Sequence, residues 1–191
     1  MLPIWLKLSY TSFVSILVPV YWRQYGPGNF LWFSDVALLL GCAAAWLEHP
    51  LLASTQAVAV LVPESLWIVE FVLRLTTGRR LVGLTDYMFE ESIPGPVRAL
   101  SLFHVWLPVV LVWLVWRLGY DRRALAVQIV LGTVLLVASR FLTARNENVN
   151  WVHRWGGVTG WRPLVLSAVA FPLAFYFPAH LLLHATMPQP K

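Results

Sequence analysis

The sequence predicts an all-α fold, a polytopic membrane helix bundle of six transmembrane helices forming a single domain over residues 1–191. Hydrophobic residues make up 59% of the chain, and charged residues make up 12%, about half the share of a soluble domain. The apolar residues fall into six long runs separated by polar turns. Eleven tryptophans and six tyrosines suit the aromatic belts at the two surfaces of a membrane.

Each element follows from the length of its apolar run, because a hydrocarbon core about 30 Å thick needs about 20 residues of helix. The connection "RQYGPGN" ends the first helix, "EHP" makes a tight hairpin of the second and third, and "GYDRR" turns the fourth into the fifth. Two connections are long, residues 75–98 and 144–162. The six expected spans are 3–22, 30–47, 51–74, 99–118, 124–143 and 163–184.

The orientation follows from the basic residues. Six spans place both termini on one side, and the three connections 1–2, 3–4 and 5–6 on the other. The side with these connections carries nine of the fourteen Lys and Arg residues, against five on the terminal side. By the positive-inside rule, the long loops are expected in the cytoplasm. We expect no cleavable signal peptide, because Lys7 interrupts the first apolar run and no basic segment precedes it.

Ionisable side chains from four predicted helices fall in one leaflet. At 1.5 Å of rise per residue, Asp35 and His104 lie about 9 Å in, Glu70 about 6 Å and Glu64 about 15 Å. Arg140 lies near the same end of the fifth helix. A charge in hydrocarbon costs at least ~2.5–3.5 kcal/mol, so these groups are expected to face one another or a wet cavity. The sequence therefore predicts a polar site centred on His104.

The parts of a hydrolase occur in this neighbourhood. A hydroxyl within hydrogen-bond reach of an imidazole is an activated nucleophile, and amide groups can hold an oxyanion. The candidate catalytic residues are His104, Ser34, Ser101, Asp35 and Glu70. The candidate binding residues are Asn148, Asn150, Trp151, Arg140 and Glu64. Structural roles stay open, since Glu70 and Arg74 are an i,i+4 pair and a lone histidine can serve packing.

Other chemistries are disfavoured. His180 and His184 have i,i+4 spacing but lie in the opposite leaflet from His104, and no HExxH, P-loop, GxGxxG or GxSxG motif occurs. We therefore predict neither a metal nor a cofactor. We expect no nucleic-acid partner, because the basic residues are scattered among the loops and form no patch. The lone cysteine, Cys42, lies in an apolar run and is interpreted as a small core residue.

Three stretches, "YGPGNFLWFSD", "IPGPVRALSLFHVWLP" and "NVNWVHRWGGVTGWRP", resemble landmarks of the androgen-induced-gene family. Its members are six-span membrane hydrolases of branched fatty-acid esters that use an intramembrane Thr and His. The resemblance implies that His104 is the catalytic histidine. Trp32 stands at the position of the threonine, and Ser34 offers the nearest hydroxyl. Nearly the whole chain also looks like a group of uncharacterised bacterial membrane proteins with "LSLFHVWLP", "LGYDRRAL" and "NxNWV" segments, which implies a bacterial inner membrane.

Three functional hypotheses follow. The first is a lipid-ester hydrolase or acyl-transfer enzyme with His104 as general base. The second is a non-catalytic lipid-binding or accessory subunit, whose partners are membrane lipids, an apolar ligand or another protein. The third is a proton-linked carrier working through Glu64, disfavoured because the terminal-side leaflet is poor in polar groups. If His104 belongs to a site, its ring is expected to contact a polar side chain of another helix, first of all Asp35, Glu70 or Ser34.

Overall fold

The computed structural model describes residues 1–190, which form helices and connecting loops without a β-strand. The long helices are α1 (Ile4–Tyr25), α2 (Phe33–Leu47), α3 (Pro50–Thr77), α5 (Phe103–Leu118), α6 (Ala124–Leu142), α7 (Arg162–Phe171) and α8 (Phe177–Thr186). The short ones are α4 (Gly95–Leu100), the 3-10 turns η1 (Pro27–Leu31), η2 (Asp86–Phe89) and η3 (Val149–Trp151), and the π-turn η4 (Pro172–Tyr176). The all-α prediction is confirmed for these residues.

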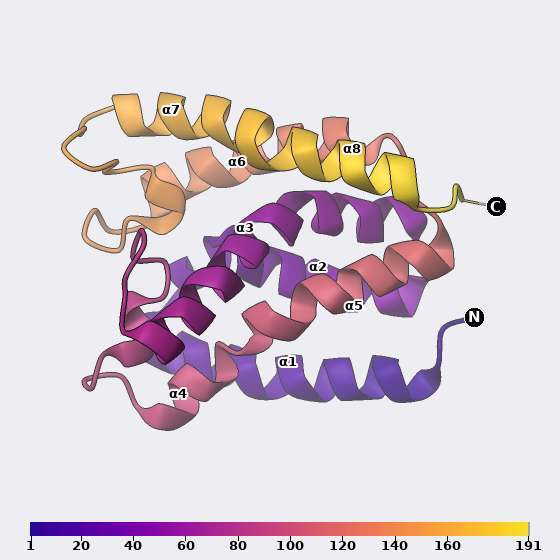
Figure 1. Ribbon diagram of the computed structural model, residues 1–191, viewed down its shortest axis with the longest axis horizontal. Coiled ribbons are helices and arrows are strands. Elements are labelled where there is room, and N and C mark those ends of the chain that lie inside the picture. The colour runs from indigo at the N-terminus through magenta and orange to yellow at the C-terminus, as the bar shows by residue number, and fades with distance from the viewer. Residues whose placement is uncertain (191) are drawn as a thin grey trace.

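The helices run between two ends of an elongated bundle (Figure 1). The N-terminus lies at the same end as the tight connections α2–α3 and α5–α6, and the chain returns to that end after α8. We call this the terminal end. The three longer connections, after α1, α3 and α6, gather at the opposite end, the loop end. The segments 75–98 and 144–162 therefore share one end of the bundle, as an even number of intervening helices requires.

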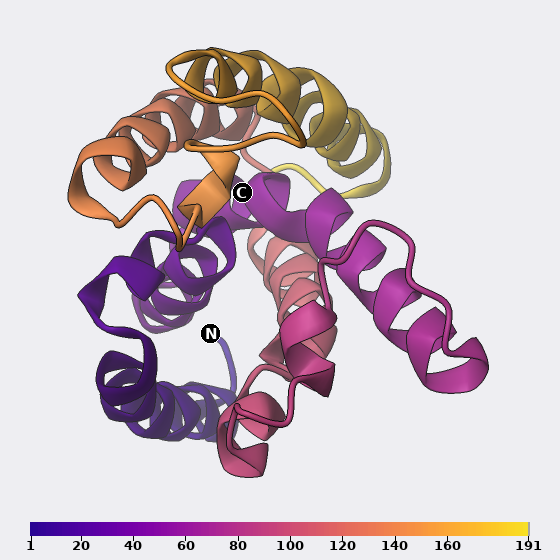
Figure 2. The same cartoon turned by 90° about the vertical axis from the view of Figure 1, so that its left-hand side faces the viewer.

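Helix α3 is the centre of the bundle. It packs against α2 and α5 on one side and against α6, η4 and α8 on the other. Figure 2, seen from the loop end, shows the first half of α3 between these two groups of helices, while its second half projects beyond them and exposes Leu66, Val69, Val72 and Leu75. Eleven of its residues are buried, and among them are the polar Ser54, Thr55, Gln56, Glu64 and Glu70. The neighbouring helices thus enclose the first half of α3, and the buried face of this helix carries several polar side chains.

Four helical stretches are long and apolar enough to cross a membrane: Ile4–Tyr25, Gly95–Leu118, Ala124–Leu142 and Arg162–Thr186. Helix α2 is apolar but has only 15 residues. Helix α3 has 28 residues but contains the buried Gln56, Glu64 and Glu70. Helix length and composition are thus consistent with an integral membrane protein and support four of the six expected spans, while the other two depend on α2 and α3.

Two of the expected helices are interrupted. The stretch 99–118 is divided at Ser101–Leu102 between α4 and α5. The stretch 163–184 widens into the π-turn η4, which begins at Pro172. Proline has no N–H for the preceding turn of helix, and a π-turn is one way to accommodate the interruption. Neither break separates the two halves of its helix in space (Figure 1).

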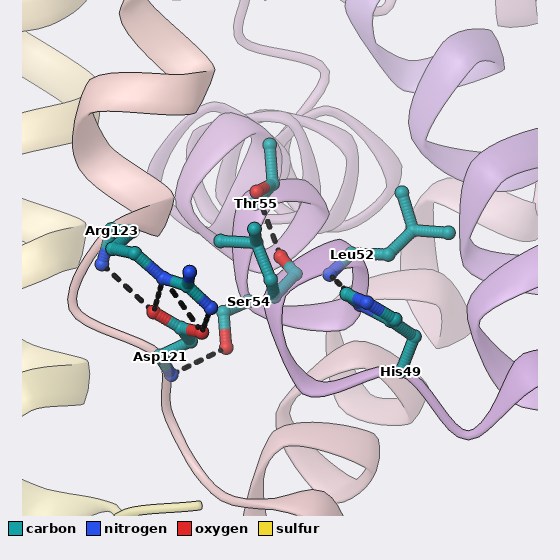
Figure 3. A network of polar contacts seen from close by, with 7 residues as sticks. His49, Leu52, Ser54, Thr55, Asp121 and Arg123 are labelled. Atoms are coloured by element: carbon teal, nitrogen blue, oxygen red, sulfur yellow. Dashed lines mark hydrogen bonds and ion pairs between the residues drawn. The ribbon is translucent and has the colours of Figure 1, made fainter.

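A polar network ties the helices together at the terminal end (Figure 3). The Asp121 N–H donates to Ser54 Oγ at 3.0 Å, which joins the start of α3 to the connection before α6. The Arg123 guanidinium pairs with Asp121 at 2.7 Å and holds the pKa of that carboxyl below its usual range. His49 caps α3 by accepting the Leu52 N–H through Nδ1 at 3.3 Å. Helices α3 and α6 both start at the terminal end, near this contact, and run toward the loop end.

Candidate functional site: the His104 cluster

His104 forms a carboxylate–imidazole pair with Glu64. The first turn of α5 presents His104, and α3 presents Glu64, so that Nδ1 and Oε2 lie 2.7 Å apart. The side chains are 14% and 5% exposed, respectively. The expectation that His104 contacts a polar side chain of another helix is confirmed. The partner is Glu64, however, and not Asp35, Glu70 or Ser34.

The inclination of α3 makes Glu64 the partner of His104. For parallel helices that begin where the sequence predicts, a rise of 1.5 Å per residue puts Glu64 about 6 Å deeper than His104. In the structure α3 runs obliquely to α1 (Figure 1) and continues to Thr77, and a break at Ser101–Leu102 precedes α5. Both effects bring Glu64 and His104 to one level.

Aromatic rings fix the plane of the imidazole. The Phe103 ring stacks on His104 with centroids 4.1 Å apart, and the Trp67 ring stacks with centroids 4.8 Å apart. Trp67 follows Glu64 by three residues, so both side chains lie on one face of α3. One helix therefore supplies both the hydrogen-bonding carboxylate of the imidazole and one of its stacking partners.

A second carboxylate lies beside the pair. Asp35, in the first turn of α2, is buried and close enough to Glu64 for their charges to interact. Its Oδ1 has no hydrogen-bond partner among the described residues. Tyr21 and Tyr25 of α1 lie within electrostatic range of Asp35, and the Tyr21 hydroxyl bonds Ser101 Oγ at 2.6 Å. The Ser101 hydroxyl thus bonds a tyrosine of α1 and makes no bond to His104.

The loop between α3 and α4 brings a third phenol. Tyr87 of η2 lies close to Ser101, Trp67 and Glu64, and burial raises the pKa of its hydroxyl well above the usual value. The Trp67 Nε1 is buried and meets no acceptor within hydrogen-bonding distance in residues 1–190. We call this group the His104 cluster. Its members are Tyr21, Tyr25, Asp35, Glu64, Trp67, Tyr87, Ser101 and His104.

Glu70 does not join the cluster. Its carboxylate is fully buried and accepts the backbone N–H groups of Val82, Gly83 and Leu84 at 3.3, 2.7 and 3.3 Å. Arg74, expected as its i,i+4 partner, pairs with Asp86 of the loop instead. Glu70 therefore anchors the loop that carries Tyr87, and it does not orient His104.

Four of the candidate binding residues form a separate group around the loop between α6 and α7. Asn150 is fully buried and joins three elements: Oδ1 accepts the Phe33 N–H at 3.2 Å, and Nδ2 donates to the Leu31 carbonyl at 2.7 Å and to Ser139 Oγ at 3.0 Å. Asn148 caps its own loop by accepting two backbone N–H groups and donating to a carbonyl. Asn150 therefore uses both of its N–H donors inside the fold, and Asn148 uses one of its two.

The other two residues of this group, Trp151 and Arg140, pack the same loop. Trp151 meets Trp32 edge to face at 5.8 Å, and the Arg140 guanidinium lies 4.7 Å from the Trp161 ring and donates to His153 Nδ1. Burial and the Arg140 charge lower the pKa of His153. Of the ten candidate site residues, the structure thus brings together His104, Glu64, Asp35 and Ser101. Ser34 is partly exposed and makes no hydrogen bond to His104 in the described chain.

The pair can perform proton transfer. A carboxylate on Nδ1 fixes the tautomer and orientation of an imidazole, which leaves the lone pair of Nε2 for a proton. No protein atom of residues 1–190 forms a hydrogen bond with His104 Nε2. No group of three or more His, Cys, Asp and Glu side chains in those residues is arranged to hold a metal ion. The arrangement therefore has the orienting acid and the base of a catalytic triad, without a nucleophile in contact.

Several cluster members were missed by reasoning from the sequence. Tyr21 and Tyr25 have i,i+4 spacing and Trp67 shares a face with Glu64, but aromatic residues near helix ends were assigned to the interfacial belts. The terminal half was also expected to be poor in polar groups, whereas Ser54, Thr55, Gln56 and Gln128 are buried there.

Comparisons of the chain with protein-family models, curated proteins and solved structures give no significant match.

Proposed function

We propose that the protein is a small integral membrane enzyme that cleaves or transfers the acyl group of a lipid ester, with His104 as general base. The observation that carries the proposal is the 2.7 Å contact between Glu64 Oε2 and His104 Nδ1. Stacking against Phe103 and Trp67 supports it, because general-base catalysis requires an imidazole held in a fixed orientation. His104 Nε2 makes no hydrogen bond to another protein group among the described residues, so it is free to accept a proton.

The attacking group in this proposal is a hydroxyl that is not part of the protein. The Ser101 hydroxyl is bonded to Tyr21, and Trp32 stands where the resembled family has a threonine. A water molecule or the alcohol of a second lipid therefore attacks the ester carbonyl. Its proton passes to His104 Nε2 as the new C–O bond forms. The imidazolium then returns that proton to the departing alkoxide, which leaves the base as it began.

The membrane placement is part of the proposal. Trp5 and Trp22 of α1 are 64% and 57% exposed and 17 residues apart, or about 26 Å along a helix, close to the thickness of a hydrocarbon core. With α2 and the enclosed α3 added to the four long apolar stretches, the chain crosses six times. The excess of basic residues at the loop end supports a cytoplasmic position of that end, and the resemblance to bacterial membrane proteins supports a bacterial inner membrane.

Ester turnover by purified protein tests the proposal. Protein in lipid nanodiscs is incubated with p-nitrophenyl esters of increasing acyl length, with and without a long-chain alcohol as acceptor. We expect His104→Gln and Glu64→Gln to lower kcat at least about 100-fold, because general-base catalysis contributes about that much or more. His184→Gln, at the terminal end, is the matched control and keeps full activity. The proposal would be rejected if His104→Gln turned over esters as fast as the wild type, or if the wild-type protein turned over none of the esters. Either result would favour an accessory subunit.

A proton-linked carrier is the second candidate. The observation that favours it is the polar content of the terminal half, where Gln56 Nε2 and both polar atoms of Gln128 are buried without partners among the described residues. Together with Glu64, these amides extend the polar positions of the bundle toward both ends. Liposomes filled with a pH-sensitive dye test this function directly. A proton leak that Glu64→Gln abolishes supports the carrier, and tight liposomes exclude passive proton conduction.

A further inference from the structure

A groove of about 330 Å³ opens between α1 and α4 at the loop end of the bundle. Figure 2 shows the two helices side by side at this end. The side chains that line the groove are Pro19, Val20, Arg23 and Gln24 of α1 and Val97 of α4. Val97 is buried and Val20 is half-buried, whereas the other three are exposed. The groove therefore has an apolar floor and is open to the surroundings of the bundle.

The lining changes from apolar to polar along α1. Pro19 and Val20 precede Arg23 and Gln24 by about one helical turn, or about 5 Å along the axis. Because α1 runs toward the loop end, the apolar pair lies on the inner side. Trp22, next to Arg23, is 57% exposed, and exposed tryptophans are typical of a membrane surface. A ligand in the groove thus meets apolar side chains toward the membrane interior and a cation at the level of lipid headgroups.

The charge of Arg23 has no partner in residues 1–190, because no carboxylate oxygen there lies within 4.0 Å of its guanidinium. Arg74 and Arg123, in contrast, each pair with an aspartate. Arg98 of α4 donates to the Met88 carbonyl at 3.1 Å and also meets no carboxylate in the part of the chain that the structure describes. The two helices that form the groove thus each carry a cation without a counter-ion.

We propose that this groove binds one anionic phospholipid of the surrounding membrane. The lipid phosphate pairs with the Arg23 guanidinium, the Gln24 amide donates to another headgroup oxygen, and an acyl chain lies on Pro19, Val20 and Val97. Arginine suits a phosphate because its planar fork donates two parallel hydrogen bonds. A choline headgroup is disfavoured, because its quaternary amine brings a second positive charge to Arg23. The inference rests on the proposed membrane crossing of α1 and is independent of the ester chemistry.

Native mass spectrometry of the detergent-solubilised protein tests the site. The protein is titrated with phosphatidylglycerol and, separately, with phosphatidylcholine of the same acyl chains. We expect one phosphatidylglycerol to bind about fivefold more tightly than phosphatidylcholine, and Arg23→Gln to remove this preference, because one arginine near an anionic lipid contributes about that factor. Arg154→Gln is the matched control, since Arg154 is an exposed arginine in the loop between α6 and α7. That variant keeps the wild-type preference.

A second variant tests the groove without changing its charge. Pro19→Trp fills the apolar half, and it is not expected to unfold α1, because proline is itself unfavourable inside a helix. We expect this variant also to lose the bound phosphatidylglycerol. Unchanged binding in Arg23→Gln or in Pro19→Trp, or an equal loss in Arg154→Gln, overturns the site. Displacement of the lipid by an equal concentration of inorganic phosphate overturns a phospholipid as the occupant. Resistance of the protein to carbonate extraction from membranes checks its membrane insertion separately.

Discussion

At the scale of single residues, Glu70 supports the site from a distance. We expect Glu70→Ala to destabilise the fold by about 3 kcal/mol, because three backbone N–H groups lose a charged acceptor. The loop then detaches, and trypsin cleaves at the exposed Arg79 and Arg80 at least tenfold faster than in the wild type. Glu91→Ala, which removes an exposed carboxylate of the same loop, serves as the control. Equal cleavage rates in the two variants would refute the anchoring role.

His153 predicts a pH dependence of stability. Burial and the nearby Arg140 lower its pKa in the folded protein below the usual value of about 6.5. The unfolded chain therefore binds more protons between the two pKa values. The contribution of neutral His153 to the free energy of unfolding is fully present above pH 6.5 and is lost as the pH falls through the lowered pKa of the folded protein. We expect the Tm to drop between pH 7.5 and 5.0, and to drop less in His153→Gln. An identical drop in both proteins contradicts this assignment.

Individual side chains were predictable where burial cost alone decides the outcome. His104 and Asp35 are expensive in hydrocarbon, and the structure buries both near Glu64. The choice of Glu64 over Glu70 as the partner of His104 was not predictable. It depends on helix inclination and on a loop that folds back to bind Glu70, and both are set by contacts between residues distant in the chain.

At the scale of elements, Asn150 in the loop between α6 and α7 holds the start of α2 against α6. Its side chain bonds the start of α2 and Ser139 of α6, and its backbone is left-handed with φ 51°. Asn150→Ala is expected to cost about 3 kcal/mol for three lost hydrogen bonds. Asn150→Gly loses the same bonds but tolerates the backbone, so it costs about 1 kcal/mol less. Unfolding in SDS measures both. A larger cost for glycine would rule out backbone strain as a component.

The limits of the helices were predictable within a few residues because turn chemistry marks them. The "EHP" segment places the α2–α3 turn, where His49 caps α3 and Pro50 begins it. The π-turn η4 was not predictable. A proline inside an apolar run predicts some irregularity, but the neighbouring helices decide whether the chain kinks, ends or widens. Here Tyr176 packs its hydroxyl against Gly132 of α6, which leaves room for the wider turn.

At the scale of the whole molecule, the arrangement of ends predicts a labelling pattern. Cysteines are introduced at the exposed Arg79, Asn146 and Arg122 in a Cys42→Ala background, because Cys42 is the lone native cysteine. With an impermeant maleimide on sealed vesicles, Arg79→Cys and Asn146→Cys are expected to label from the same side. Arg122→Cys, at the terminal end, labels from the other. Labelling of the first two from opposite sides would exclude six crossings.

The order and direction of the helices were predictable, because the sequence alternates long apolar runs with polar turns. The central position of α3 was not. Its polar residues Gln56, Glu64 and Glu70 could mark a helix that faces water, a helix outside the bundle or a helix enclosed by others. Only the packing of five neighbouring elements around α3 selects the last.

Enclosure of α3 has a consequence for how the chain is made. Glu64 leaves the ribosome 40 residues before His104, the partner that satisfies it. At a synthesis rate of about 5–20 residues per second, the carboxyl waits about 2–8 s. During that interval α3 has only α1 and α2 beside it, and a polar helix does not partition into lipid unaided. If α2 and α3 cross the membrane as proposed, their nascent hairpin is expected to stay at the insertion machinery until α5 emerges, and the speed of translation across residues 64–104 then affects the yield of folded protein.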